Sequence, residues 1–174
     1  GRMLLGTDIG ATLTILESLP IDIIGLNCST GPEHMLAPIS YLGEHATLPV
    51  SAIPNAGLPL NVDGEAVYPL EPIPYAESMY EYITKHNVNI VGGCCGTTPE
   101  HLKLLVDKVH NHPAPARPQK QQAHLSSSIG TLAMAQEPRP LLIGERLNAT
   151  GSRKFKRLLL NEDFDAMVTL ARDQ

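Results

Sequence analysis

The residues best suited to chemistry in this chain are its three cysteines, Cys28, Cys94 and Cys95. Together they could supply three thiolate ligands to one zinc ion and leave a fourth position open for a substrate. An open position is typical of catalytic zinc sites, and a set of three soft thiolates suits a substrate that binds through sulfur. Zinc also deprotonates a coordinated thiol that would otherwise be largely protonated at neutral pH. The cysteines therefore predict a zinc site that activates a thiol.

The cysteines belong to a short motif that occurs twice. Residues 28–34 read Cys-Ser-Thr-Gly-Pro-Glu-His and residues 95–101 read Cys-Gly-Thr-Thr-Pro-Glu-His, with five of seven positions identical. Each copy follows an apolar, strand-like run and leads into a helical pattern. A lone cysteine at a strand end is usually buried for packing. Its repetition at the same architectural position favours a single metal site built from both copies.

The remainder of the motif is interpreted as the start of a helix. Thr30 and Glu33 have the spacing of a capping box, and Pro38 should kink the helix that follows or shift its start. His34 and His101 are interpreted as surface or capping residues of their helices, not as metal ligands. The chemistry is therefore assigned to the cysteines.

Strand-like and helix-like segments alternate through residue 110, which predicts an α/β fold with a parallel sheet. We expect strands over residues 21–27, 48–55 and 89–94 and helices over 8–19, from about 30, over 75–85 and from 97. Residues 56–74 form a long loop, which in compact domains usually has a function. Active sites in such folds lie at the carboxyl ends of the strands, where the cysteines are expected.

Two α/β architectures are compatible with this alternation. A flavodoxin-like fold would require a phosphate loop, and the sequence contains no Gly-x-Gly-x-x-Gly. A (β/α)8 TIM barrel is therefore preferred. Because a complete barrel takes about 250 residues, residues 1–111 are expected to be the C-terminal half of a barrel cut from a longer protein.

The chain changes character after residue 111. Residues 112–139 are rich in proline, glutamine and serine, including Gln119, Gln121 and Gln122, and are interpreted as a linker. Residues 140–174 are interpreted as the opening of a second domain, with helices over 153–160 and 163–173.

The composition argues against several classes of function. The net charge of the 174 residues is −5, with 4% aromatic residues and no basic stripe, so no nucleic-acid partner is expected. No run of 18 apolar residues occurs, so no membrane partner is expected either. An odd number of cysteines, two of them adjacent, fits a reducing cytoplasmic setting better than a disulfide framework.

Several segments resemble the homocysteine S-methyltransferase family. The resemblance lies in Gly-Leu-Asn-Cys at 25–28, Pro-Asn-Ala-Gly at 54–57 and the segment 92–101. Residues 144–156 resemble the start of the pterin-binding domain of the cobalamin-dependent methionine synthases. This resemblance implies that residues 140–174 are the first elements of a second TIM-type barrel. The two segments in this order are similar to that group, and not to the betaine- or S-methylmethionine-dependent relatives, which lack a folate domain.

The resemblance implies a reaction and its cofactors. Cys28, Cys94 and Cys95 would bind zinc and activate homocysteine as a thiolate. The thiolate would accept a methyl group from methylcobalamin, held by a cobalamin domain of the same polypeptide, and methionine would form. The cobalamin would be recharged by 5-methyltetrahydrofolate. The chain lacks half of the homocysteine barrel and most of the folate barrel, so we expect it to be inactive and poorly soluble by itself.

The resemblance also implies roles for three polar residues. The side-chain oxygen of Asn55 would occupy the fourth zinc position until homocysteine displaces it, whereas the sequence alone suggests a turn residue before Gly57. Asn148 and Glu145 match residues near the pterin pocket, although a turn after a strand explains them equally well. Two alternatives to the whole assignment are a betaine-type methyltransferase fragment and a structural zinc module without catalysis.

Overall fold

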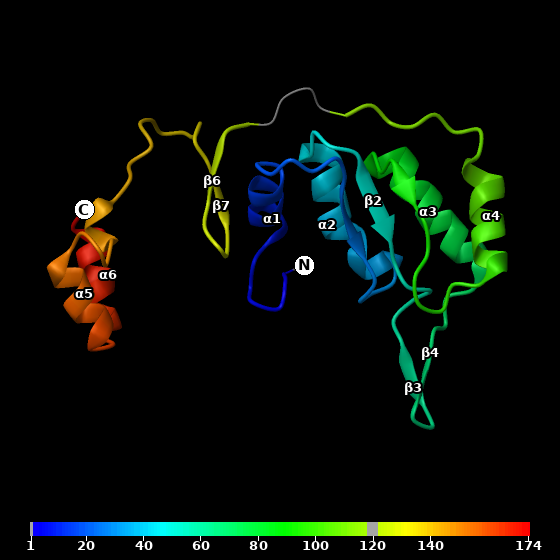
Figure 1. The fold of residues 1–174 in the computed structure, drawn as a ribbon, viewed down its shortest axis with the longest axis horizontal. Coiled ribbons are helices and arrows are strands. Elements are labelled where there is room, and N and C mark those ends of the chain that lie inside the picture. The colour runs from blue at the N-terminus through cyan, green and yellow to red at the C-terminus, as the bar shows by residue number, and fades with distance from the viewer. Residues whose placement is uncertain (1, 118–121) are drawn as a thin grey trace. The chain divides into compact units, whose positions relative to one another are not determined.

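The computed structural model describes residues 2–117 and 122–174 (Figure 1). Contacts divide the chain into two compact units, residues 1–134 and 135–174, which are considered separately below. Gln119 and Gln121 of the predicted linker lie outside the described residues.

The first unit is built around a parallel sheet of three strands, which confirms the α/β class. The strands are β1 (Ile24–Asn27), β2 (Val50–Ile53) and β5 (Ile90–Val91), in the order β1-β2-β5. The helices are α1 (Ile9–Leu16), α2 (Pro32–His45), α3 (Pro72–His86) and α4 (Pro99–Val109). Helix α2 connects β1 to β2 and α3 connects β2 to β5, so the unit contains two consecutive βαβ connections (Figure 1). The closed barrel remains a prediction.

The hydrophobic core lies where α2 and α3 cover the sheet. Its fully buried members include Ile39 and Leu42 of α2, Val50 and Ala52 of β2, and Met79 of α3. Alternation of buried and half-buried residues along β2 places Val50 and Ala52 on the same face, toward these helices. The parallel register pairs Asn27 of β1 with Ile53 of β2 and Ala52 of β2 with Val91 of β5. The three strands therefore end together, and the loops that follow them share one edge of the sheet.

The start of α2 differs from the prediction. The predicted capping box of Thr30 and Glu33 is wrong, because α2 begins at Pro32 with Gly31 as its N-cap residue. A Cβ atom on Gly31 would lie 2.6 Å from the Cα atom of Gly57, so the two backbones approach too closely for any residue but glycine. Pro38 did not shift the start of the helix, which continues through it to His45.

A β-hairpin occupies much of the predicted loop over residues 56–74. Strands β3 (Leu60–Val62) and β4 (Glu65–Val67) pair antiparallel, with Leu60 opposite Val67. Asp63 and Gly64 turn the chain with φ angles of 54° and 89°. Asp-Gly is a strong signal for a two-residue hairpin turn because both positions tolerate positive φ.

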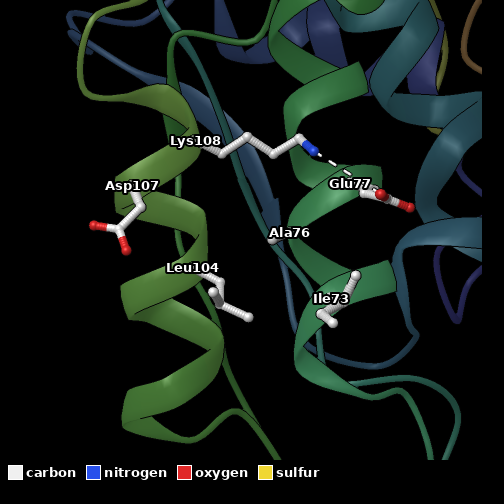
Figure 2. Close-up of a pocket in the computed structure, with 6 residues that line it drawn as sticks. All are labelled: Ile73, Ala76, Glu77, Leu104, Asp107 and Lys108. Carbon is white, nitrogen blue, oxygen red and sulfur yellow. Dashed lines mark ion pairs between the residues drawn. The ribbon is translucent and has the colours of Figure 1, made fainter.

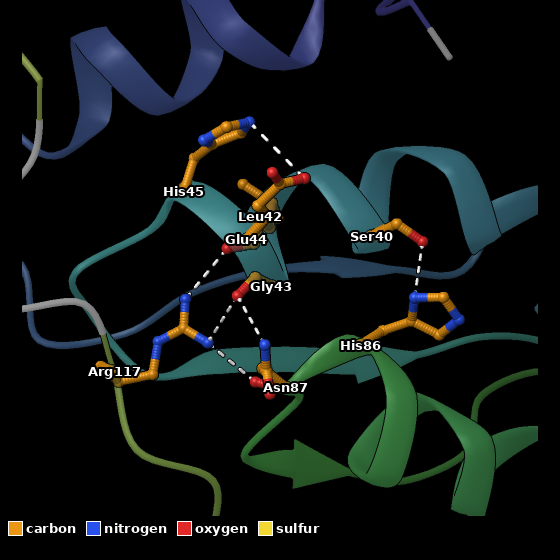
Figure 3. Close-up of polar contacts among 8 residues, drawn as sticks. All are labelled: Ser40, Leu42, Gly43, Glu44, His45, His86, Asn87 and Arg117. Carbon is orange, nitrogen blue, oxygen red and sulfur yellow. Dashed lines mark hydrogen bonds and ion pairs between the residues drawn. The ribbon is translucent and has the colours of Figure 1, made fainter.

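The chain after α4 is held against the amino ends of the strands. Arg117 donates hydrogen bonds to the carbonyl oxygens of Leu42 at 2.9 Å and of Asn87 at 2.8 Å, as Figure 3 shows. It also reaches Gly43, so its guanidinium binds carbonyl oxygens at the C-terminal ends of α2 and α3, where the helix dipole favours a cation. Asn89 donates to the carbonyl oxygen of Pro115 at 2.8 Å.

A second hairpin lies within the predicted linker. Strands β6 (His124–Ser126) and β7 (Thr131–Ala133) pair antiparallel and belong to the first unit. The hydroxyls of Thr14 in α1 and Thr131 in β7 lie 3.1 Å apart, and the Asp8 amide donates to the carbonyl oxygen of Ile129 at 2.8 Å. The linker boundaries at 112 and 139 remain predictions.

The second unit contains a short 3₁₀ helix, η1 (Glu145–Leu147), followed by α5 (Arg153–Leu160) and α6 (Phe164–Arg172). Ser152 caps α5 by accepting a hydrogen bond from the Phe155 amide at 3.2 Å. Asp163 caps α6 in the same manner. Both predicted helices are therefore present, whereas their membership of a second barrel remains a prediction.

Candidate metal centre

The three cysteines lie together at the carboxyl edge of the sheet. Cys28 directly follows β1, and the Cys94-Cys95 pair follows β5. The Sγ atom of Cys95 lies 3.8 Å from that of Cys28 and 3.8 Å from that of Cys94, and all three sulfurs lie within 4.8 Å of one another. The structure thus brings together the sulfur atoms of both motif copies, which are 67 residues apart in sequence.

The spacing of the sulfurs fits a tetrahedral zinc site. Zinc–sulfur bonds of about 2.3 Å at tetrahedral angles place two ligand sulfurs roughly 3.8 Å apart. The Cys95–Cys28 and Cys95–Cys94 separations both have this value, and the Cys28–Cys94 separation lies within 4.8 Å. Cys28 and Cys94 are half-buried and Cys95 is exposed, so one side of the cluster is accessible to a fourth ligand. The donor set therefore fits zinc with three protein ligands.

The backbone after β2 holds the two cysteine loops in place. The Cys28 amide donates to the carbonyl oxygen of Ile53 and the Cys94 amide to that of Pro54, both at 2.9 Å. Strand β2 is the central strand, so its end provides a common support for the loops on either side. The close arrangement of the sulfurs is therefore a consequence of the strand order.

Asn55 lies between the two loops and contacts both of them. Its side chain is 2% exposed, and its Oδ1 atom accepts a hydrogen bond from the Cys95 amide at 3.1 Å. The Asn55 side chain is also the smallest of the influences that lower the pKa of the Cys28 thiol. Its own amide donates to the carbonyl oxygen of Thr30 at 3.0 Å. These bonds give Asn55 a positioning role, while its role as a fourth zinc ligand remains a prediction.

Hydrogen bonds change the acidity of the cysteines in opposite directions. The pKa of the Cys28 thiol is lowered, first by the Ser29 backbone N–H and then by the neighbouring thiols. For Cys95 the largest influence is a hydrogen bond with Tyr68, which lowers the pKa. The neighbouring thiols and desolvation outweigh it, so the pKa of Cys95 is raised. Without a metal Cys28 is thus the first of these two to ionise, whereas a bound divalent cation would favour the thiolate at every ligand.

His101 has a second role beyond the predicted one. It forms a capping box with Thr98 at the start of α4, which confirms its interpretation as a capping residue. Its Nδ1 atom accepts from the Thr98 amide at 3.2 Å, so its Nε2–H donates to the carbonyl oxygen of Leu70 at 2.8 Å. The ring is 5% exposed. Sequence reasoning missed the bond to Leu70, which holds the chain after the β3–β4 hairpin.

Tyr75 of α3 is another positioning residue that the sequence does not reveal. Its hydroxyl donates to the carbonyl oxygen of Gly92 at 2.7 Å and contacts that of Pro54 at 3.2 Å. The phenol is fully buried, and burial raises its pKa above the usual range. Tyr75 therefore connects the end of β5 with the segment that carries Asn55. Its apolar helix position predicts burial but not this contact.

Two surface cavities lie outside the cysteine cluster. Figure 2 shows a groove of about 290 Å³ between α3 and α4. It is lined by Ile73, Ala76, Glu77, Leu104, Asp107 and Lys108, and Glu77 pairs with Lys108 at 3.9 Å. A second cavity of about 360 Å³ lies beside the first motif copy and is lined in part by Gly31, Glu33 and His34. His34 is exposed, as the sequence predicts.

The two candidate pterin residues lie in the second unit and contact each other. Asn148 and Glu145 are both exposed, and their side chains approach to 3.5 Å. The Oδ1 atom of Asn148 accepts from the Thr150 amide at 3.0 Å, which is the contact of a turn residue. Their pterin-binding role remains a prediction.

Comparison with known proteins identifies the class of the chain. Residues 1–109 match the family model described as homocysteine S-methyltransferase. The chain belongs to this family. Within residues 2–117 and 122–174, no helix has both the length and the apolar character needed to span a membrane.

Two curated relatives are more specific. The chain is 43% identical over its whole length to the methionine synthase of Mycobacterium tuberculosis (strain ATCC 25618 / H37Rv). It is 41% identical, again over its whole length, to the methionine synthase of Mycobacterium leprae (strain TN). The chain spans about 15% of the length of each relative.

Proposed function

We propose that this chain carries the zinc-binding part of a methionine synthase and that its three cysteines activate homocysteine as a methyl acceptor. The observation that carries the proposal is the pair of 3.8 Å sulfur separations at the carboxyl edge of the sheet. Zinc, when bound, would act as a Lewis acid that keeps a thiol ionised at neutral pH. Cys28, Cys94 and Cys95 would hold the ion from one side, so the homocysteine sulfur would approach from the accessible side near Cys95.

The other residues of the chain would keep this site in shape. Asn55 accepts a hydrogen bond from the Cys95 amide and donates one to the Thr30 carbonyl oxygen, so it limits how far the two cysteine loops can separate. Its side-chain oxygen would also serve as the fourth zinc ligand without substrate. Such restraint matters because a displacement of about 1 Å in an active site can cost roughly 100-fold in rate.

The remaining partners of the reaction are proposed from the family and its relatives. The methyl donor would be methylcobalamin on a cobalamin domain of the same polypeptide, recharged by 5-methyltetrahydrofolate. Residues 1–111 would form the C-terminal half of a homocysteine-binding TIM barrel, and residues 140–174 would begin a pterin-binding domain in which Asn148 and Glu145 contact the pterin. A cytoplasmic location is proposed because three free thiols at one site require reducing conditions.

The observations favour this assignment over its two alternatives. A structural zinc module would need a fourth protein ligand that closes the site, whereas among the described residues the cluster of His, Cys, Asp and Glu ligands consists of the three cysteines. A betaine-type enzyme with an unrelated tail is disfavoured because the similarity to methionine synthases covers the whole chain, residues 140–174 included.

X-ray absorption at the zinc edge tests the proposal in the complete polypeptide. We expect three sulfur ligands and one lighter ligand at rest, and four sulfur ligands after homocysteine is added. The Cys28→Ser variant should lose the zinc, whereas Ser29→Gly, a change in the same exposed loop without a sulfur, should retain it. A zinc spectrum that homocysteine leaves unchanged would rule out the catalytic role and support a structural site.

A further inference from the structure

Helix α5 carries a cluster of basic residues in a chain that is acidic overall. Four of its first five residues are exposed cations, named here the α5 basic cluster: Arg153, Lys154, Lys156 and Arg157. The whole chain has a net charge of −5, and α5 contains no acidic residue. Residues three or four positions apart are neighbours on a helix, so Arg153 lies beside Lys156 and Arg157. Positive charge is therefore concentrated on one face of α5.

Two properties of the α5 basic cluster oppose the stability of the helix. Neighbouring like charges repel one another, and cations in the first turn lie at the positive end of the helix dipole, where an acidic residue would be favourable. Two other lysines of the described residues are paired with acids at i,i+4, Lys85 with Glu81 and Lys103 with Asp107. Within the same residues, no ion pair involves the cluster. A local charge arrangement that costs stability is expected where a surface has a function, here the binding of an anion.

The cluster follows the candidate pterin residues directly. The amides of Gly151 and Ser152 donate to the Asn148 carbonyl oxygen at 3.2 Å and 2.8 Å, so the chain turns tightly from Asn148 into α5. Five residues span at most about 18 Å, which bounds the distance from Asn148 to Arg153. The cluster then extends along about 6 Å of helix. A ligand bound at Asn148 thus has the cluster within reach of its far end.

A folate is anionic at the end opposite its pterin. This end is a glutamate with two carboxylates, and each further glutamate joined through a γ-carboxyl group adds one more. A pterin held by Asn148 and Glu145 would leave this tail free to extend toward α5. Guanidinium and ammonium groups bind carboxylates through charge-assisted hydrogen bonds, and a guanidinium can bind one carboxylate with two such bonds. The tail therefore has the charge and the repeated carboxylates that the cluster would recognise.

We propose that the α5 basic cluster binds the glutamate tail of a folate and prefers a tail of several glutamates to a single one. The inference rests on the proposed function, since it requires the pterin to bind at the start of the second unit. The cluster would hold the tail alone, so recognition of the pterin would remain with Asn148 and Glu145.

Calorimetric titration of the complete polypeptide tests this preference, with 5-methyltetrahydrofolate that carries either one or three glutamates. Wild type should bind the triglutamate form more tightly, and higher ionic strength should narrow the difference because it screens exposed charges. Arg153→Gln combined with Arg157→Gln should weaken triglutamate binding about 5- to 20-fold, since one exposed ion pair contributes up to roughly fivefold. Binding of the monoglutamate form should weaken less. Glutamine is a good helix former, so the double variant should keep α5 folded.

Arg172→Gln is the matched control, because Arg172 is an exposed arginine of α6 in the same unit but outside the cluster. It should leave both affinities unchanged. If the double variant behaves like this control, the proposal is wrong. An equal weakening of both forms would show a role other than tail binding and would overturn it as well. Wild type that binds both forms equally tightly refutes this inference alone, whereas wild type that binds neither form refutes the proposed pterin-binding domain itself.

Discussion

The two copies of the repeated motif begin from nearly the same residues and end in different surroundings. In the first copy, Gly31 precedes Pro32, no side chain of the described residues caps α2, and His34 is exposed. In the second, Thr98 takes the place of Gly31 and caps α4 together with a buried His101. Identical residues at five positions therefore do not have identical roles.

The difference follows from what each copy meets in space. The first copy passes so close to Gly57 that its N-cap position must be glycine, and its histidine is left facing a surface cavity. The second copy meets the end of the β3–β4 hairpin, where Leu70 offers a carbonyl oxygen to His101. What the copies share is the placement of Cys28 and Cys95 at the same sheet edge.

The largest effect is expected at the second position of the motif, which follows Cys28 in one copy and Cys95 in the other. Gly96→Ala should destabilise the unit by about 3 kcal/mol, because it adds left-handed backbone strain to a clash with Tyr68. Ser29 has a similar φ of 64° but is exposed, so Ser29→Gly should stabilise by up to about 1 kcal/mol. Native-state hydrogen exchange of α2 and α4 amides measures both. Equal changes in stability at Gly96 and Ser29 would show that the two copies do not differ at this position.

The two histidines should differ almost as much. His101→Ala leaves the half-buried carbonyl oxygen of Leu70 without this partner and opens a cavity at the buried ring, so a loss of about 2–3 kcal/mol is expected. His34→Ala should change stability by less than about 0.5 kcal/mol because His34 is exposed. Denaturant unfolding of the metal-loaded polypeptide distinguishes them. A costly His34→Ala variant would mean that the first copy also depends on its histidine.

Exchanging the N-cap residues should give unequal results. Gly31→Thr should cost about 2 kcal/mol, because the new Cβ would lie 2.6 Å from the Cα atom of Gly57. The reverse change, Thr98→Gly, should cost a few tenths of a kcal/mol, since glycine is itself an acceptable N-cap residue. Thermal unfolding with zinc present provides the measurement. A neutral Gly31→Thr variant would show that the approach of Gly57 does not dictate the cap.

The smallest contrast concerns Thr98 and Thr30, the threonines that precede α4 and α2. Thr98→Ala removes an N-cap side chain and should destabilise α4 by about 1 kcal/mol. Thr30→Ala should have an effect below about 0.5 kcal/mol, because Gly31 and not Thr30 is the N-cap residue of α2. Protection of the first amides of each helix would resolve the pair, and a marked loss of protection in α2 would restore Thr30 to a capping role.

The sequence allows the α/β class and the grouping of the cysteines to be predicted, because both follow from local patterns. Apolar runs mark the strands, and parallel strands must end at one edge. The β3–β4 hairpin was missed although Asp63-Gly64 signals it. The N-cap of α2 at Gly31 instead of Thr30 and the roles of Tyr75 and His101 depend on contacts between distant segments. No local pattern encodes such contacts, and the metal role of the cysteines itself remains proposed.

The bonds from Arg117 and the β6–β7 hairpin have a consequence for the reach of the second unit. They fasten the chain to the first unit as far as Met134. The chain between Met134 and Glu145 contains no helix or strand and would span at most about 40 Å if it were fully extended. A short connecting segment confines the domain that it carries to a small volume and raises the local concentration of that domain. The attachment of the β6–β7 hairpin to α1 thereby shortens the length of chain that separates the two units.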